Sequence, residues 1–204
     1  MKPLIIGMFF VLASACGDVN VNTVTRPSPA GISFRGHVFD FATSIAVPNA
    51  AIDMHDLNSG MPIIPSVITD ANGLFATTST RFGFFSIRVD GTPIGVASAH
   101  GIQNRGDFYI TRRPCISRYG VVSDARTLRP VPGATVMLNT GSARTGPDGW
   151  YRIDFGCSGG SIGFTTGHMR VTHPRYAQGQ FPVGPGLRGV ERFDVDLQPI
   201  SSSR

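Results

Sequence analysis

The sequence has little of the charge that long exposed helices need. Only 15% of its 204 residues are charged, whereas 25 are Gly and 15 are Pro. Gly and Pro both disfavour a helix interior, and so few charges exclude a coiled coil or a charge-driven disordered chain. We therefore expect a compact chain rich in β-strands and turns.

Lysine is almost absent, because Lys2 is the only one and every other basic residue is Arg. Once a signal peptide containing Lys2 is removed, the Lys–Asn isopeptide bond that staples some surface β-sandwiches is excluded. Four arginines lie near the middle of the chain, and we interpret them as a solvated basic linker: Arg105, Arg112, Arg113 and Arg118. Contact with anionic lipid headgroups, acidic glycans or a partner is the alternative.

The only long apolar run begins the chain, as MKPLIIGMFFVLASAC. Lys2 supplies a positive start, and the apolar stretch from Leu4 to Leu12 is shorter than the roughly 20 residues that a membrane-spanning helix needs. The small residues at 13–15 fit a signal-peptidase site. This order predicts an export signal over residues 1–15.

Cys16 follows the predicted cleavage site directly. This arrangement resembles a bacterial lipoprotein signal, which implies that Cys16 is lipidated and anchors the mature chain to a membrane. Ordinary secretion after the same cut is the alternative. Residues 16–31 are polar and contain Pro27-Ser28-Pro29, which predicts a flexible tether.

Two cysteines remain, Cys115 and Cys157. An exported chain meets an oxidising compartment, so these two thiols can pair. We predict a disulfide rather than a metal site, which needs more ligands.

The rest of the chain is one unit written twice. The segments GHVFDFATSIAVPNAAIDM and GVVSDARTLRPVPGATVML align at a constant offset of 84 residues. The aligned pairs are Gly36 with Gly120, Val38 with Val122, Asp40 with Asp124, Val47 with Val131, Pro48 with Pro132, Ala50 with Ala134, and Ile52 with Val136. Further on, TDANGLF aligns with TGPDGWY at an offset of 76, which places eight extra residues of the first copy in 58–67. We predict two domains, 32–113 and 114–200.

The apolar residues within each copy recur at every second position, the period of a strand. Ile52 and Met54 are predicted to face a core. Near the C-terminus we expect Phe193, Val195 and Leu197 to face inward and Arg192, Asp194 and Asp196 to face solvent. Asn72-Gly73 and Asp148-Gly149 predict tight turns, and no convincing amphipathic helix is found. The fold class is all-β, with a β-sandwich in each copy.

The shared motifs are G-x-V-x-D, V-P-x-A-x-V/I and T-D/G-x-D/N-G-x-F/Y. They resemble those of the carboxypeptidase regulatory-like domain, over residues 32–199. This resemblance implies two tandem seven-stranded β-sandwiches of the transthyretin-like (prealbumin-like) type. Zinc carboxypeptidases take ligands from a His-x-x-Glu segment, whereas the one Glu here, Glu191, has Arg188 three residues before it. Only the accessory domain is resembled, so we predict no enzyme and assign no catalytic residue.

Other chemistry is weakly indicated. Five histidines are spread along the chain, and we predict neither a metal site nor a cofactor. Asp70 and Asn72 start like a calcium loop, but we expect a turn cap because no acidic residue follows at the required spacing. A Ser–His–Asp site stays open on composition, and a cleft joining those three would indicate a hydrolase.

These observations predict a non-catalytic lipoprotein of the bacterial cell envelope, on its periplasmic side or at the cell surface. It would bind or support an envelope protein or polysaccharide, with a membrane contact through its anchor and no nucleic acid partner. The alternative is a carbohydrate-binding protein. Its candidate ligand-binding residues are aromatic: Trp150, Tyr109, Tyr119 and Tyr176.

Overall fold

The computed structural model describes residues 31–113, 115–157, 167–183 and 189–200. The predicted signal peptide, Cys16 and all of the predicted tether except Gly31 lie outside these residues. Within them the chain forms 15 strands and one short helix, so the predicted all-β class is confirmed. Among the described residues, no helix is long and apolar enough to cross a membrane.

The first half is a sandwich of two sheets around one apolar core. One sheet has the order β4-β1-β7 and the other contains β6-β5-β2-β3. The core takes Phe34 and Phe75 from one sheet and Ile52, Met54 and Phe85 from the other. The strands are β1 (Ile32–Asp40), β2 (Ala51–Asp56), β3 (Val67–Ile68), β4 (Leu74–Ser79), β5 (Phe84–Val89), β6 (Thr92–Ser98) and β7 (Phe108–Ile110), with helix α1 (Ala99–Asn104) after β6.

The second half repeats this arrangement. One sheet has the order β10-β9-β12-β13, and the other contains β11-β8-β14, with β15 also paired to β8. Val136, Leu138, Met169 and Val171 from the first of these sheets pack against Tyr151 from the second. The strands are β8 (Ile116–Asp124), β9 (Thr135–Leu138), β10 (Gly141–Arg144), β11 (Trp150–Gly156), β12 (Gly167–His173), β13 (Tyr176–Val183), β14 (Val190–Phe193) and β15 (Val195–Leu197).

The sequence repeat is also a repeat of hydrogen bonds. The N–H of Val38 donates to Gly73 over 2.9 Å, and that of Val122 donates to Gly149 over the same distance. Buried Thr69 donates its hydroxyl to the Val47 carbonyl and accepts from the Ala50 N–H, both at 2.8 Å. Thr145 makes the same two bonds, to Val131 and from Ala134, at 2.7 and 2.8 Å. The two copies therefore share one set of turn and loop contacts.

The predicted turns and the extra loop are in place. Gly73 and Gly149 have φ angles of 70° and 72°, a region that glycine adopts without strain. The Asp70 carboxylate accepts from the N–H groups of Asn72 and Leu74 at 2.8 and 2.9 Å, so it caps a turn as expected. The eight extra residues lengthen the connection from β2 to β3.

One short helix departs from the sequence prediction. The segment AHGIQN forms α1, whose first turn is capped by the Ser98 hydroxyl accepting from the Gly101 N–H at 2.8 Å. Ile102 on this helix is fully buried. A helix of six residues is too short to show a period of 3.6 in its sequence, so no pattern predicts it.

The predicted disulfide between Cys115 and Cys157 is present. Cys115 precedes β8 and Cys157 follows β11, and these strands pair in antiparallel orientation. The bridge closes a loop of the second half alone.

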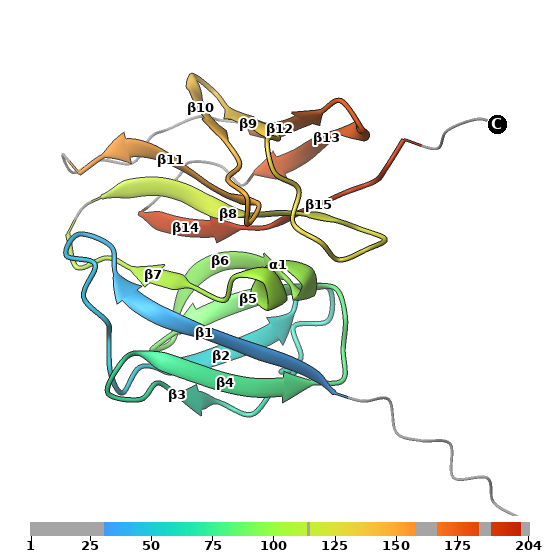
Figure 1. Cartoon of the computed structure of the whole chain (residues 1–204). Helices are drawn as coiled ribbons and strands as arrows, with labels where there is room; N and C mark the ends of the chain where they lie inside the picture. Colours follow the sequence, from blue (N-terminus) through green and yellow to red (C-terminus); the bar gives the residue numbers. More distant parts are fainter. Residues whose placement is uncertain (1–30, 114, 158–166, 184–188, 201–204) are drawn as a thin grey trace, which may run out of the picture.

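The two halves share one sheet. Strand β14 pairs in parallel with β8 of its own half and with β6 of the first half, where Arg192 lies opposite Gly95 and Phe193 opposite Val96. Figure 1 shows β14 lying between β8 and β6 where the halves meet. Each half thereby covers an edge strand of the other, which protects edges that would otherwise be open to pairing.

The phase predicted for this last segment is wrong for Arg192 and Asp194, and Asp196, also expected in solvent, has only 13% of its side chain exposed. Arg192 and Asp194 have 0% and 1% of their surface exposed, although alternation placed them in solvent. Phe193, expected in the core, is only partly buried. The face of β14 that would be wet in an isolated sandwich is covered by the first half, which is why the period of two failed here.

Candidate functional site

The junction between the halves is built around an ion pair. The Arg192 Nε donates to the Asp194 Oδ1 over 3.0 Å, and neither side chain is exposed. The Arg192 guanidinium also donates to the carbonyls of Arg105 and Asp107, each at 2.7 Å, and lies over the Phe108 ring. The second half therefore places the Arg192 guanidinium against two backbone carbonyls of the first half.

Asp194 completes the contact in the reverse direction. Its two oxygens accept from the N–H of Ser98 in the first half at 2.9 Å and from the N–H of Val121 in the second at 3.0 Å. Burial raises the pKa of the Asp194 carboxyl, against the opposing effect of Arg192. A Cβ at Gly101 would lie 2.2 Å from Asp194 Oδ2, so this close approach requires glycine. A buried pair with all these partners fixes geometry more than it adds stability.

A Ser, a His and an Asp also meet at this junction. The Ser98 hydroxyl donates to Asp196 Oδ1 at 3.2 Å, and His100 Nδ1 lies 3.0 Å from Asp196 Oδ2. A hydrolytic triad needs the Ser to contact the His, with the carboxylate behind it. Here the Ser and the His both contact the carboxylate, and Ser98 is fully buried as a helix cap. The arrangement anchors α1 to β15, and it has no exposed nucleophile.

Burial and the charge of Asp194 raise the pKa of the Asp196 carboxyl to about 6, against the opposing effect of His100. This carboxyl therefore titrates close to neutral pH.

Three of the four candidate aromatic residues pack together at the junction. Tyr119 has no exposed surface, and its ring lies 5.1 Å from Tyr109 and 5.3 Å from Trp150. The Tyr109 N–H donates to the Tyr119 hydroxyl at 2.9 Å. The rings of these residues meet at 42° to 80°, so no pair among the three offers a coplanar platform for a sugar. Tyr119 is corrected from a ligand-binding candidate to a packing residue, because burial leaves no face for a ligand.

Two of the four arginines near the middle of the chain are held by the protein. The Arg118 guanidinium lies 2.8 Å from Glu191 and is buried. Arg105 contacts Asp107 and Asp148 and lies over the Trp150 ring at 4.1 Å. The interpretation of a solvated linker is therefore wrong for these two, because Arg105 joins the first half to Asp148 and Trp150 of the second, and Arg118 is paired within the second half. Arg112 and Arg113 are exposed, as expected.

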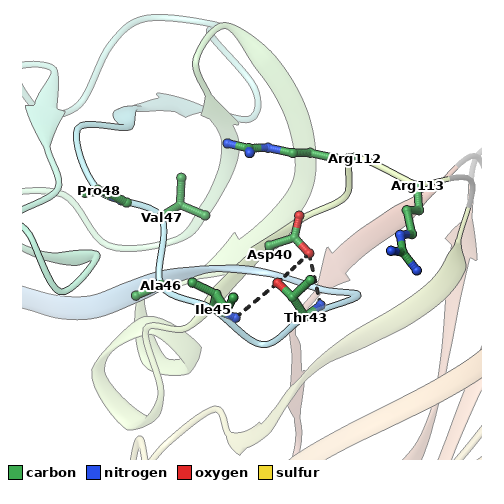
Figure 2. Close-up of a pocket in the computed structure, with 8 residues that line it drawn as sticks. All are labelled: Asp40, Thr43, Ile45, Ala46, Val47, Pro48, Arg112 and Arg113. Atoms are coloured by element: carbon green, nitrogen blue, oxygen red, sulfur yellow. Dashed lines mark hydrogen bonds between the residues drawn. The ribbon is translucent and has the colours of Figure 1, made fainter.

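Arg112 and Arg113 line a hollow of about 450 Å³ beside the loop that follows β1. Figure 2 shows the two side chains diverging, with Arg112 extending toward Val47 and Arg113 directed away from it. The wall is apolar, formed by Ile45, Val47 and Pro48. At its floor, Asp40 accepts from Thr43. Partial burial acts to raise the pKa of Asp40, but the hydrogen bonds from Thr43 and Ala42 lower it.

A second hollow, of about 610 Å³, lies on the outer side of the second half and includes Tyr176, the remaining aromatic candidate. Across the described ranges, no group of three or more His, Cys, Asp or Glu side chains lies close enough to hold a metal.

The sequence matches no family profile and no curated protein. Among solved structures, the TIE protein of Bacillus anthracis is 12% identical over 83% of this chain and 34% of its own, with a TM-score of 0.31. The Streptococcal ancillary pilin is 14% identical over 87% of this chain and 64% of its own, at 0.32. The shaft pilin SpaA from Lactobacillus rhamnosus GG is 9% identical over 85% of this chain and 100% of its own, at 0.33.

This chain spans about a third of the TIE protein and about two thirds of the ancillary pilin. At such scores, these structures assign neither a family nor a function to it.

The residues that make the junction do not stand out in the sequence. Arg192, Asp194, His100 and Asp196 come from distant parts of the chain, and only the pairing of β14 with β6 brings them together. One signal was present: the segment ISRYGVVSD lacks the clean alternation of its partner copy ISFRGHVFD. A strand covered on both faces loses that alternation.

Proposed function

We propose that this chain is a non-catalytic protein of the bacterial cell envelope, in which two sandwiches form one rigid body held to a membrane through lipidated Cys16. Each half, 32–113 and 114–200, is proposed to be a carboxypeptidase regulatory-like domain. The equal strand orders of the two halves, 4-1-7 and 11-8-15 in one sheet and 3-2-5-6 and 10-9-12-13 in the other, support this division.

The buried pair of Arg192 and Asp194 carries the proposal. A flexible linker between two independent domains would not need a desolvated cation held by carbonyls of the other half. Such a pair is costly unless every partner is in place, so it favours a single relative orientation. A fixed orientation suits a spacer or scaffold that holds the surfaces of its two halves at a set angle to each other.

Residual dipolar couplings test this rigidity directly. One alignment tensor should fit the amide couplings of β2 and β5 together with those of β9 and β12. Two different tensors would mean that the halves reorient independently, and the proposed scaffold would then be wrong.

The anchor needs its own experiment. Replacing Cys16→Ala should block processing and release the protein from the membrane fraction. Wild-type cleavage followed by secretion of this variant would reject the lipid anchor and leave ordinary export.

A protein partner or a polysaccharide of the envelope remains the proposed target. The alternative function, carbohydrate binding, retains only Tyr176 among the candidates that lie outside the junction. A pull-down from solubilised envelope with the lipidated protein separates these two classes of target. A stable protein partner favours the scaffold, whereas saturable binding in a polysaccharide panel favours the alternative.

A further inference from the structure

We infer that the hollow on the outer face of β9, β10, β12 and β13 is a binding site for an acidic saccharide. This inference rests on the alternative function, carbohydrate binding, and deepens it, and it depends on neither the lipid anchor nor the rigid junction. The hollow measures about 610 Å³, within the usual range of small-ligand sites. The side chains that carry the argument are Thr135, Arg144, Thr172, His173, Tyr176 and Gln178.

Polar side chains form a row across this sheet. Arg144 on β10 lies opposite Thr135 on β9, and Thr135 lies opposite Thr172 on β12. Directly opposite residues of antiparallel strands point to the same face. Among the described residues, the Thr135, Thr172 and Gln178 side chains make no hydrogen bond to the protein. Two hydroxyls and an amide are thus left for a ligand rich in hydroxyl groups.

Arg144 lines the hollow and forms no ion pair among the described residues, and the Asp124 carboxylate beside Tyr176 accepts from the Tyr176 hydroxyl. Arg144 donates only a long bond of 3.4 Å from Nε to the Gly133 carbonyl. Partial burial, then the charges of Arg175 and Arg144, lower the pKa of His173. His173 Nδ1 accepts from the Arg175 N–H at 3.2 Å, so a neutral His173 carries its proton on Nε2. Arg144 is the cation that lines the hollow, Arg175 adds positive charge near His173, and the His173 ring is hydrogen-bonded to the Pro132 backbone.

An aromatic ring borders the hollow. The Tyr176 ring lies 5.1 Å from His173, and its hydroxyl donates to Asp124 Oδ2 at 2.8 Å. Burial and this bond raise the pKa of Tyr176, which keeps the phenol protonated. The ring is half-buried and its orientation is fixed, as is useful for packing against a sugar ring.

The first half shows that the fold does not require these residues. At the positions equivalent to Thr135, Arg144 and Thr172 it has Ala51, Ile68 and Asp90. The Asp90 carboxylate is used by the Ala51 N–H at 2.8 Å. At these three positions the first half therefore has neither an arginine nor a free threonine hydroxyl. Because the fold does not need them, their presence in the second half points to a ligand.

The side chains that line this hollow best match a sugar that carries a carboxylate. A single arginine can hold one carboxylate by paired hydrogen bonds, while Thr135, Thr172 and Gln178 meet ring hydroxyls. Arg144 is the arginine of the lining and stands among neutral donors, with Arg175 outside the lining, which favours a sugar carboxylate over a phosphate or an anionic membrane surface.

The test is a titration of the full mature protein in detergent with an oligomer of galacturonic acid, followed by amide chemical shifts. Saturable shifts at β9, β12 and β13 are expected, with little response to a neutral galacto-oligosaccharide of the same length. Arg144→Gln should weaken binding about tenfold or more. Gln178→Ala should weaken it less, and neither exposed site is expected to affect folding.

The control is Arg88→Gln, which removes the same charge from β5, the strand of the first half that is equivalent to β12. It should bind as the wild type does. Equal losses in the two arginine variants would mean unspecific charge attraction and overturn the inference. So would the absence of saturation, equal binding of the neutral sugar, or equal shifts with inorganic phosphate or phosphatidylglycerol vesicles.

Discussion

Strands β1 and β8 occupy the same place in the two halves, yet their burial differs. In β1 the outward residues Ser33 and Arg35 are exposed, and His37 is partly exposed. In β8 every residue is buried, including Tyr119 and Val121 at the positions equivalent to Arg35 and His37. The backbone pattern is the same, so the difference comes from the neighbour: the first half covers β8, and nothing described covers the outer face of β1.

Residues that each sandwich needs for its core can thus be told apart from residues that the contact between the halves needs. The inward residues Val38 and Val122 are conserved between the copies because each sandwich needs a core. The outward residues differ because those of β1 face water and those of β8 face the first half of the protein. The outward residues of each copy therefore depend on whether the other half covers that copy's strand.

The largest expected effect compares equivalent positions on these two strands. Tyr119→Ala should lower the free energy of unfolding by about 3–5 kcal/mol, because it removes a fully buried ring. Arg35→Ala should change it by less than about 0.5 kcal/mol, since its side chain faces solvent. Urea denaturation measures both. Equal losses would remove the distinction between the covered and the open face.

The next comparison uses two Arg–Asp pairs with the same spacing. Arg192→Met should cost about 3–5 kcal/mol of unfolding free energy, because it leaves Asp194 and two carbonyls buried without their partner. Arg152→Met breaks the exposed pair with Asp154 and should cost about 1 kcal/mol or less. A small loss in Arg192→Met would show that water reaches the junction and that the halves are not locked.

The disulfide gives an effect confined to one half. Replacing both Cys115→Ser and Cys157→Ser should cost roughly 3–4 kcal/mol through the closed loop of the second half. Hydrogen exchange should then quicken in β8 and β11 more than in their equivalents β1 and β4. Reduction of the wild type should reproduce the result. Unchanged exchange in β8 would contradict a structural role for the bridge.

The smallest effect concerns the pH dependence of the junction. Because the pKa of folded Asp196 is about 6, above the 3.8 of a free carboxyl, the native state binds more protons between about pH 4 and 6. The contribution of Asp196 to the free energy of unfolding is therefore fully present below about pH 4 and is lost as the pH rises through about 6. Asp196→Asn should flatten that slope and raise stability at pH 7 by about 1–2 kcal/mol.

Asp53→Asn, on β2 of the first half, controls for the loss of one charge and should leave the slope unchanged. A slope retained in Asp196→Asn would assign the pH dependence to His100 or Asp194, the other titratable groups that face Asp196.

The local part of the fold could be predicted from the sequence. The repeat, the turns at Gly73 and Gly149, and the inward phase of Ile52 and Met54 depend on neighbouring residues, and all are confirmed. The disulfide followed from a count of cysteines.

The junction could not be predicted in the same way. Arg192 and Asp194 read as solvent-facing because alternation describes one sheet face, and the pairing of β14 with β6 joins residues almost 100 positions apart. The hollow near Tyr176 depends on cross-strand register, which no motif specifies. Aromatic residues were chosen by type, but their exposure depends on the contact between the halves.

The most direct test of the central claim is cooperative unfolding of the two halves. Trp150, the only tryptophan, lies at the junction, so its fluorescence reports the contact between the halves. Its urea transition should coincide with loss of exchange protection in β2 and β5 of the first half and in β9 and β12 of the second. A Trp150 transition that precedes the loss of protection, with each half unfolding later at its own midpoint, would show two independent domains and contradict the rigid body.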